Sequence, residues 1–241
     1  MNRHDNHRLT RCMEYRETPP PPHLAGLIKT RWTLVGDGAA DAWTEQQATP
    51  DGCVEIIRRT HGASRWDGDQ PASFVVGLVA RPQPFAISGD AAFEALRLWP
   101  WAWTAIGAIP LAALQGRWAA WDAPAFDAIE ARLAADPDLN AIGAALVATP
   151  SVAAMSAATA MPPRALQRWF ARHVGLPPRV WLRLRRFQSA FETLPGEDSL
   201  AGHAAAQGYA DQAHMAREFR TLAGVPATAA RRRARGPFLD G

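Results

Sequence analysis

The sequence is poor in cysteine and has no long apolar run. Its two cysteines, Cys12 and Cys53, are too few for a disulfide scaffold or for a zinc site made of four cysteines. The longest strongly apolar run, residues 74–80, is far shorter than the roughly 20 residues that cross a bilayer. The first residues are polar and charged and lack the apolar segment of a secretion signal. These absences predict a soluble, cytoplasmic protein without a metal or a cofactor.

Lysine is almost absent, and the positive charge is placed unevenly. From residue 151 onward the chain has 13 arginines and six acidic residues, a net charge of +7. Because the whole chain carries +3, the first 150 residues carry −4. The length of 241 residues agrees with two domains. A basic last third therefore suggests a polyanionic partner for one domain and a different task for the other.

The first half of the chain has the pattern of a β-rich domain. Residues 1–18 are polar and four prolines follow them, so we expect a flexible tail that leads into a domain over 19–123. Residues 49–52 have the composition of a turn. Short apolar stretches broken by Gly, Pro and Asp predict strands at 27–35, 53–58, 74–80 and 93–99.

Helical spacing replaces this pattern after residue 99. Residues 101–106 and 111–114 are predicted as short helices or turns around Pro110, and helices are predicted at 124–135 and 139–147. Phe126, Ile129 and Leu133 recur at helical spacing, which predicts an amphipathic helix. We place the boundary between the two domains in the helical linker region 124–150.

From residue 151 onward the sequence predicts two short helix pairs joined by one long helix. Ser151 and Ser199 are suited to cap the first helix of each pair, because a serine hydroxyl accepts a free backbone N–H. The predicted helices are 152–159, 164–173, 178–194, 200–207 and 212–222. Two helix-turn-helix patterns at this separation are far more specific than one. The predicted fold class is therefore α+β, a β-rich N-terminal domain followed by an all-α double helix-turn-helix domain over 151–235.

The C-terminal helices carry motifs with fixed spacing. These are Arg164-x-Leu-x-Arg-x-Phe170, Gly175-Leu-Pro-Pro178, Arg186-Phe-x-x-Ala190, Ala204-x-x-x-Gly-Tyr-x-Asp-Gln-x-His-Met-x-Arg-x-Phe219 and Gly224-Val-Pro226. Together they resemble the AraC/XylS family of transcriptional regulators over about residues 150–233. Two residues depart from the family pattern. Ser156 stands where the family usually has alanine, and His203 stands where it has an aliphatic residue, which puts the packing at 203 in question.

The resemblance implies how these helices would meet DNA. In the family, the second helix of each pair enters a major groove, and the long helix holds the two about one DNA turn apart. The residues that fall on the DNA-contacting faces are Arg164, Gln167, Arg168 and Arg172 in the first pair and Gln212, His214, Arg217 and Arg220 in the second. Arg and Gln suit guanine and adenine edges, but an outward Arg can instead contact a phosphate or only solvent. The basic run Arg231–Arg235 is either a mobile solvated tail or an additional phosphate contact.

The N-terminal part carries a fainter resemblance, in Trp32 and in residues 49–55, 76–77 and 96–100. It resembles an uncharacterised domain that precedes this DNA-binding domain in some family members, which implies a regulatory domain for an unknown small-molecule effector. Eight of the ten tryptophans lie here, and they either pack in the core or line an effector pocket. Three roles stay open for Glu55: it orients a ligand, it pairs with Arg97, or it faces solvent. Neither cysteine has the sequence neighbours of a redox sensor.

The sequence therefore predicts a transcription regulator that binds double-stranded DNA, and not an enzyme. RNA polymerase is a further candidate partner, and the protein is expected to be a monomer or a homodimer. Two rival functions stay open. One is a sequence-neutral DNA-binding or interaction protein. The other is an enzyme fused to a DNA-binding module, such as an alkylation-repair methyl acceptor, which would need a metal-held reactive cysteine.

Overall fold

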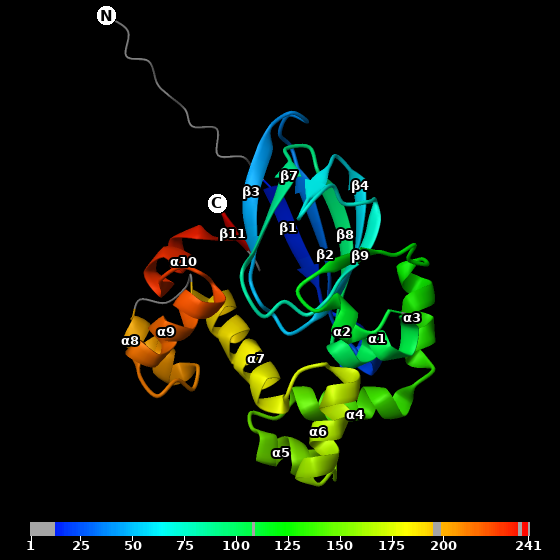
Figure 1. Ribbon diagram of the computed structural model, residues 1–241, viewed down its shortest axis with the longest axis vertical. Coiled ribbons are helices and arrows are strands. Elements are labelled where there is room, and N and C mark those ends of the chain that lie inside the picture. Colours follow the sequence, from blue (N-terminus) through cyan, green and yellow to red (C-terminus); the bar gives the residue numbers. More distant parts are fainter. Residues whose placement is uncertain (1–12, 108, 195–198, 236–237, 241) are drawn as a thin grey trace, which may run out of the picture.

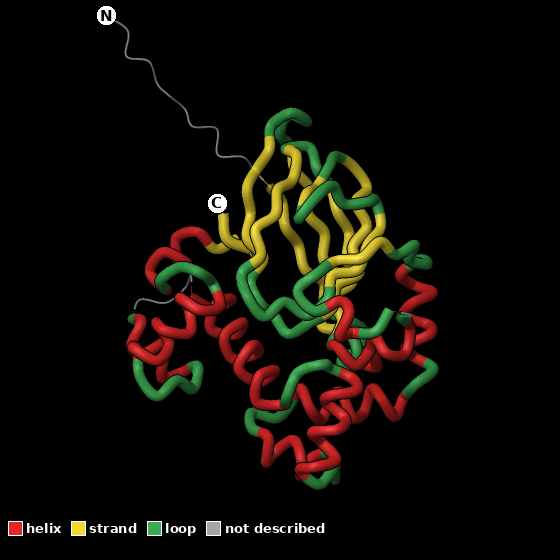
Figure 2. The backbone as a smooth tube through the Cα atoms, in the orientation of Figure 1, coloured by secondary structure: helices red, strands yellow, loops and turns green. Residues whose placement is uncertain are grey.

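The structure, a computed structural model, describes residues 13–107, 109–194, 199–235 and 238–240. Two antiparallel sheets face each other in its N-terminal part, and helices surround one end of them (Figure 1). Figure 2 shows the same division, with strands gathered at one end of the molecule and helices at the other. The predicted α+β organisation is confirmed, because a β-sheet domain over residues 13–120 is followed by a helical region.

The larger sheet has six strands among the described residues, in the order β1–β2–β8–β4–β6–β9. They are β1 (Met13–Thr18), β2 (Ile28–Gly36), β4 (Val54–His61), β6 (Ser73–Val76), β8 (Ala92–Leu98) and β9 (Trp118–Ala120). Trp32, Ile57 and Phe93 belong to the core between the two sheets, whereas Ile56 and Leu96 belong to the core shared with the helices. Burial on both faces explains the nearly continuous apolar sequence of the central strands.

The smaller sheet joins distant parts of the chain. Its five described strands follow the order β10–β11–β3–β7–β5. They are β3 (Trp43–Ala48), β5 (Ser64–Arg65), β7 (Gln83–Ser88), β10 (Ala234–Arg235) and β11 (Phe238–Asp240). β11 runs antiparallel to β3, with Phe238 opposite Ala48, and the side chain of Leu239 is fully buried. The last described strand therefore completes an N-terminal sheet.

Ten α-helices and one short 3-10 helix complete the described residues. They are η1 (Pro22–Leu24), α1 (Pro100–Ile106), α2 (Leu111–Leu114), α3 (Phe126–Ala134), α4 (Pro137–Val147), α5 (Val152–Ala158), α6 (Pro163–His173), α7 (Pro178–Thr193), α8 (Leu200–Ala206), α9 (Gln212–Leu222) and α10 (Ala227–Arg233). Phe126, Ile129 and Leu133 of α3 are buried, as their spacing predicts. No helix in the described ranges is long and apolar enough to cross a membrane.

The core is continuous from the larger sheet to the C-terminal helices. One cluster of buried side chains includes Leu96 of the sheet, Trp101 of α1, Phe170 of α6 and Trp181 of α7. Each of these side chains is at most 1% exposed. The β-rich part and both helix-turn-helix units therefore share one hydrophobic core.

Several expected boundaries differ from the structure. Residues 13–18, expected in a flexible tail, form β1, because they pair along their whole length with β2; residues 1–12 lie outside the description. The strand predicted at 74–80 ends at Val76. Gly77 follows it, where a Cβ would lie 2.1 Å from the carbonyl oxygen of Leu114. The strands predicted at 27–35, 53–58 and 93–99 are confirmed, whereas β3 and β7 have mixed polar sequences that do not announce a strand.

Candidate nucleic-acid interface

The first helix-turn-helix unit consists of α5 and α6. Ser151 caps α5, since its Oγ accepts the N–H of Ala154 at 3.1 Å, as the sequence predicts. Ala160, in the left-handed region at φ 53°, turns the chain, and a proline pair precedes the body of α6. Leu166 and Phe170 are buried on one face of α6. The other face exposes the predicted side chains Arg164, Gln167, Arg168 and Arg172.

The second unit consists of α8 and α9. Gly208, at φ 73°, turns the chain between them. Asp211 caps α9, with its Oδ1 accepting the N–H of His214 at 2.6 Å. Gln212, Arg217 and Arg220 are exposed as predicted. His214 is only half-exposed, because its ring lies edge-on to Tyr209 with 5.3 Å between the centroids.

Helix α7 lies between the two units and contacts the second helix of each (Figure 1). Its predicted apolar stripe is entirely buried: Trp181, Leu184, Phe187, Phe191 and Leu194. The ring of Trp181 packs on Phe170 of α6 at 5.8 Å, and the ring of Phe187 packs on Phe219 of α9 at 5.1 Å. One rigid helix therefore carries both α6 and α9, which we call the recognition helices.

An ionic cluster with a buried carboxylate and two partly exposed arginines joins α9 to α7. Glu218 is 5% exposed, and its Oε1 accepts hydrogen bonds from Nε of Arg183 and Nη2 of Arg186, both at 2.9 Å. The guanidinium of Arg186 also lies over the ring of Tyr209, 4.7 Å from its centroid. Sequence reasoning missed Glu218, although its position three residues after the inward Met215 places it on the buried face of α9. We call Arg183, Arg186 and Glu218 the ionic clamp.

The exposed faces of the recognition helices are basic. α6 contains no acidic residue, and the one carboxylate within α9, that of Glu218, is buried. Apart from Asp211, which caps α9, no exposed carboxylate therefore lies beside these guanidinium and amide groups on either helix. Such groups suit both phosphates and base edges in a major groove.

The N-terminal domain packs directly against α6 and α7. Trp181 of α7 donates its indole N–H to the carbonyl of Gly52 at 3.0 Å, and its ring packs edge-on against Trp101 at 5.2 Å. Gly52 has φ 72°, and a Cβ there would come within 3.2 Å of the Trp181 indole nitrogen. On α6, Trp169 packs against Trp101 at 5.8 Å. The clustered tryptophans of α1 are thus core residues at the junction.

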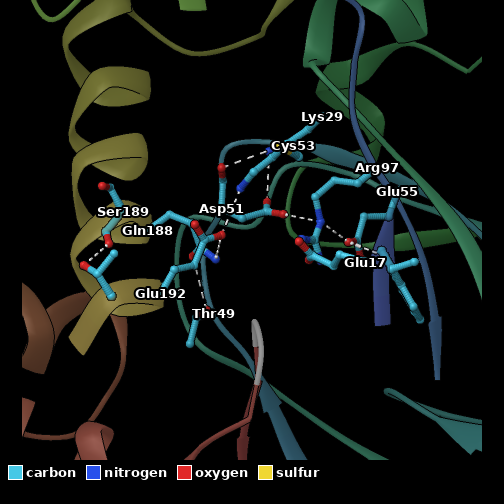
Figure 3. A network of polar contacts seen from close by, with 12 residues as sticks. Glu17, Lys29, Thr49, Asp51, Cys53, Glu55, Arg97, Gln188, Ser189 and Glu192 are labelled. Carbon is cyan, nitrogen blue, oxygen red and sulfur yellow. Dashed lines mark hydrogen bonds and ion pairs between the residues drawn. The ribbon is translucent and has the colours of Figure 1, made fainter. Parts of the chain in front are cut away.

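A polar network continues from this junction into the larger sheet (Figure 3). The buried guanidinium of Arg97 lies 2.6 Å from Glu55, 3.1 Å from Asp51 and 3.0 Å from Glu17. The pairing of Glu55 with Arg97, one of the alternatives for this residue, is confirmed. Burial raises the pKa of Glu55, although Arg97 acts in the opposite direction.

The same junction carries polar contacts from α7 to the N-terminal domain. Lys29 of β2 pairs with Glu192 of α7 at 3.1 Å. Thr49, in the loop after β3, lies 3.5 Å from the amide oxygen of Gln188. Helix α7 is therefore held by the N-terminal domain through ionic and polar contacts as well as through Trp181.

His203 and Cys53, which the sequence singled out, are both buried in the fold. His203 is buried, with its Nε2 2.8 Å from the carbonyl oxygen of Ala190, so the polar ring is accommodated by a hydrogen bond. Cys53 is buried, and burial raises the pKa of its thiol, which opposes formation of a reactive thiolate. Cys12 lies outside the described residues. Within the described part of the chain, no three His, Cys, Asp or Glu side chains gather as a metal site requires.

The basic run near the C-terminus belongs to ordered elements. Arg231 and Arg232 lie in α10, which is followed by β10 and β11. A mobile tail is therefore the wrong expectation for this backbone, while the phosphate contact stays a prediction.

The second unit also contacts the smaller sheet. Gln47 of β3 donates its Nε2 to the carbonyl of Ala223, just after α9, at 2.5 Å.

Two hollows are relevant to ligands. A cavity of about 60 Å³ lies between the sheets, with aromatic walls and two polar side chains, Glu55 and Gln70. Its aromatic lining is Trp32, Trp66, Phe74, Phe85 and Phe93. An open groove of about 550 Å³ is lined by α7, residues 147–150 and the turn before α9. The first is small and mostly apolar, whereas the second is open and runs along α7 beside the turn of the second unit.

Comparison with known families divides the chain in the same way. Residues 155–233 match the family described as a helix-turn-helix domain. Residues 16–119 match a domain of unknown function, DUF6597. The sequence matches no curated protein at a significant level.

Among solved structures, the chain is similar to ToxT from Vibrio cholerae. One ToxT structure has a TM-score of 0.42 and 7% identity, over 78% of this chain and 95% of that one. A structure of wild-type ToxT bound to an unsaturated fatty acid has a TM-score of 0.42 and 10% identity, over 81% of this chain and 93% of that one.

Proposed function

Because the chain is an AraC-type helix-turn-helix transcription regulator, we propose that α6 and α9 read two successive stretches of one DNA site and that the N-terminal domain controls this reading. The family consists of regulators, so the alternative of a fused enzyme is dropped. The observation that carries the proposal is the pair of exposed basic helices held on one rigid helix, α7.

The proposed DNA contacts are the exposed polar side chains of the two recognition helices. They are Arg164, Gln167, Arg168 and Arg172 on α6, and Gln212, His214, Arg217 and Arg220 on α9. The side chains of Arg168 and Arg217 are exposed, so we expect the packing of both helices to stay intact when they are removed. Each is expected to contribute about 1–3 kcal/mol to binding of the correct site.

The test compares one operator duplex with a scrambled duplex of the same length and composition at a single salt concentration. Operator selection from a random pool identifies the site first. Arg168→Ala and Arg217→Ala should each weaken operator binding by about 1–3 kcal/mol, with a small effect on the scrambled duplex. Arg179→Ala, an exposed arginine at the start of α7, is the matched control. Equal affinity of the parent for both duplexes would favour a sequence-neutral DNA-binding protein.

The regulatory part of the proposal is supported by the seat of α7 on the N-terminal domain. The cavity of about 60 Å³ between the sheets has room for a few non-hydrogen atoms, with Glu55 and Gln70 as its polar partners. A thermal-shift screen of metabolites should use the whole chain, because the core continues from the sheets into the helices. A ligand that binds the folded state raises the unfolding temperature. We propose RNA polymerase as a further partner and the cytoplasm as the location. We also propose that the protein is a monomer or a homodimer, and sedimentation with and without operator would distinguish these two states.

A further inference from the structure

We propose that Glu218 is a positioning residue for base recognition: its buried carboxylate sets the rotation of α9 about its own axis relative to α7. The inference rests on the proposed function, because it takes α9 as a helix that reads bases. Glu218 is not placed to touch DNA itself, since it is 5% exposed and faces α7.

The position of Glu218 in α9 links the buried and exposed faces of the helix. Arg217 precedes it and is exposed, about 100° away around the helix axis. A rotation that pulls Glu218 away from α7 therefore swings Arg217 across the groove by the same angle. Base recognition by two parallel hydrogen bonds tolerates little error in such an angle, because both bonds must form together.

The apolar contacts of α9 are less suited to fix this rotation. Phe219 packs against Phe187 at 5.1 Å and Phe191 at 6.5 Å between ring centroids. Such contacts stabilise by area and carry little directional preference. The ionic clamp is directional, because one carboxylate oxygen accepts from two guanidinium groups, each at 2.9 Å. Arg186 is in turn held over the ring of Tyr209.

The two donors approach from successive turns of the linker helix. Arg183 and Arg186 are three residues apart on α7, so they lie on one face of it, one above the other. A carboxylate that bonds both is confined along the axis of α7 as well as around it. The clamp therefore defines where α9 sits on the linker, in addition to stabilising the contact.

The experiment uses the whole chain and selection of duplexes from a random pool. The parent should select a site with two half-sites, and Arg168→Ala and Arg217→Ala assign each half-site to α6 or α9. Failure of the parent to select any site would contradict the proposed function itself. Glu218→Gln keeps the side-chain volume and removes the charge. Glu45→Gln changes the net charge equally at an exposed position of β3 and is the matched control.

Glu218→Gln should lower base preference about tenfold in the half-site of α9 and leave the half-site of α6 unchanged. Binding to scrambled DNA should stay near that of Glu45→Gln. Arg186→Gln should have a similar effect, and the double variant should lose no more than the stronger single variant, because both act through one contact. Glu218→Asp, which keeps the charge, should restore part of the preference. Should Glu218→Gln fail to fold, Arg186→Gln carries the same comparison.

Two results would overturn the proposal. In one, Glu218→Gln leaves the base preference of both half-sites unchanged. In the other, it reduces preference in both half-sites equally, or binding to operator and scrambled DNA equally, as a general loss of stability would. A merely structural glutamate would lower the unfolding temperature without this selective change at one half-site.

Discussion

The two helix-turn-helix units have the same sequence pattern but are held in different ways. In the first unit, α6 reaches the N-terminal domain: Trp169 packs on Trp101, and His173 Nδ1 lies 3.0 Å from the hydroxyl of Thr104. In the second unit, α9 is oriented on α7 by Phe219 and by the ionic clamp. The N-terminal domain meets this unit at Ala223, beyond the C-terminal end of α9.

This difference bears on regulation. Both recognition helices belong to the core shared with the N-terminal domain, but only α6 touches α1 directly, through Trp169, so we expect a change in that domain to act first on α6. If the ionic clamp sets its orientation, the second recognition helix should keep its place on α7 when the N-terminal domain changes. We therefore expect the N-terminal domain to act unequally on the two recognition helices, and the variants below separate their contributions.

The largest effect is expected from one residue inserted after Arg185. The insertion rotates the following part of α7 by about 100°, which takes Phe187 out of line with Trp181 and moves Glu218, together with α9, away from Arg183. The two recognition helices then no longer face successive grooves together, and operator affinity should fall by about a thousandfold or more, toward that for scrambled DNA. Titration of both duplexes measures it. An insertion after Gly68, in a turn far from α7 where an added Cβ would meet no atom within 4 Å, is the control. Retained operator preference would show that one unit reads the site alone.

The next largest effect is expected for Trp181→Ala. Its buried ring contacts Trp101 and Phe170, so its loss should lower the free energy of unfolding by about 3–5 kcal/mol. Trp181→Phe keeps most of the packing and removes the hydrogen bond to Gly52, which should cost about 1 kcal/mol. Urea denaturation compares them. Similar losses in the two variants would argue against a packed seat for α7.

A moderate effect is expected for Leu239→Asp in β11. This side chain is fully buried, so the substitution should lower the free energy of unfolding by at least about 1.5–3 kcal/mol. Arg232→Gln, at an exposed position of α10, should leave stability nearly unchanged and weaken binding to operator and scrambled DNA alike, if this arginine meets a phosphate. A selective loss of operator binding in Arg232→Gln would contradict that contact.

The smallest effect concerns pH and the first unit. The Thr104 hydroxyl donates to the Trp101 carbonyl at 2.7 Å, so its oxygen accepts from Nδ1–H of His173. Burial, and then Arg172, lower the pKa of His173 below its usual 6.5. As pH falls through about 6.5, the unfolded chain binds a proton that the folded chain resists, so His173 lowers the free energy of unfolding there and has no such effect at higher pH.

Denaturation at about pH 7.5 and about pH 5.5 measures this contribution. His173→Phe keeps a ring against Trp169 and removes the titrating group, so its stability should fall less over this range than that of the parent. The same loss in both proteins would assign the pH dependence to other groups.

The C-terminal helices could be predicted closely because their signals are local. Ser151, Ser199 and Asp211 cap the helices that follow them, and the stripe from Trp181 to Leu194 is buried as its spacing indicates. These signals depend on neighbours within a few residues. The predicted DNA-facing side chains are exposed for the same reason, apart from the half-buried His214.

What could not be predicted depends on contacts between distant segments. β1 is mostly exposed at a sheet edge, so its sequence is polar and resembles a tail. Pairing of β11 with β3 joins residues about 190 apart, and no periodicity announces it. Glu218 is polar but buried, because its two partners lie on another helix. The role of Trp101 at the junction likewise depends on its contacts with α6 and α7, which are distant from it in the sequence.

The pairing of β11 with β3 also has a consequence during synthesis. β3 leaves the ribosome long before its partner, because about 190 residues separate Ala48 from Phe238. At the usual rates of translation this interval lasts roughly 10–40 s. Throughout it, one edge of β3 has free backbone hydrogen-bonding groups, which can pair with a strand of another nascent chain. Each newly made molecule therefore passes through a stage in which this edge of β3 is open, and the stage ends when β11 pairs with it.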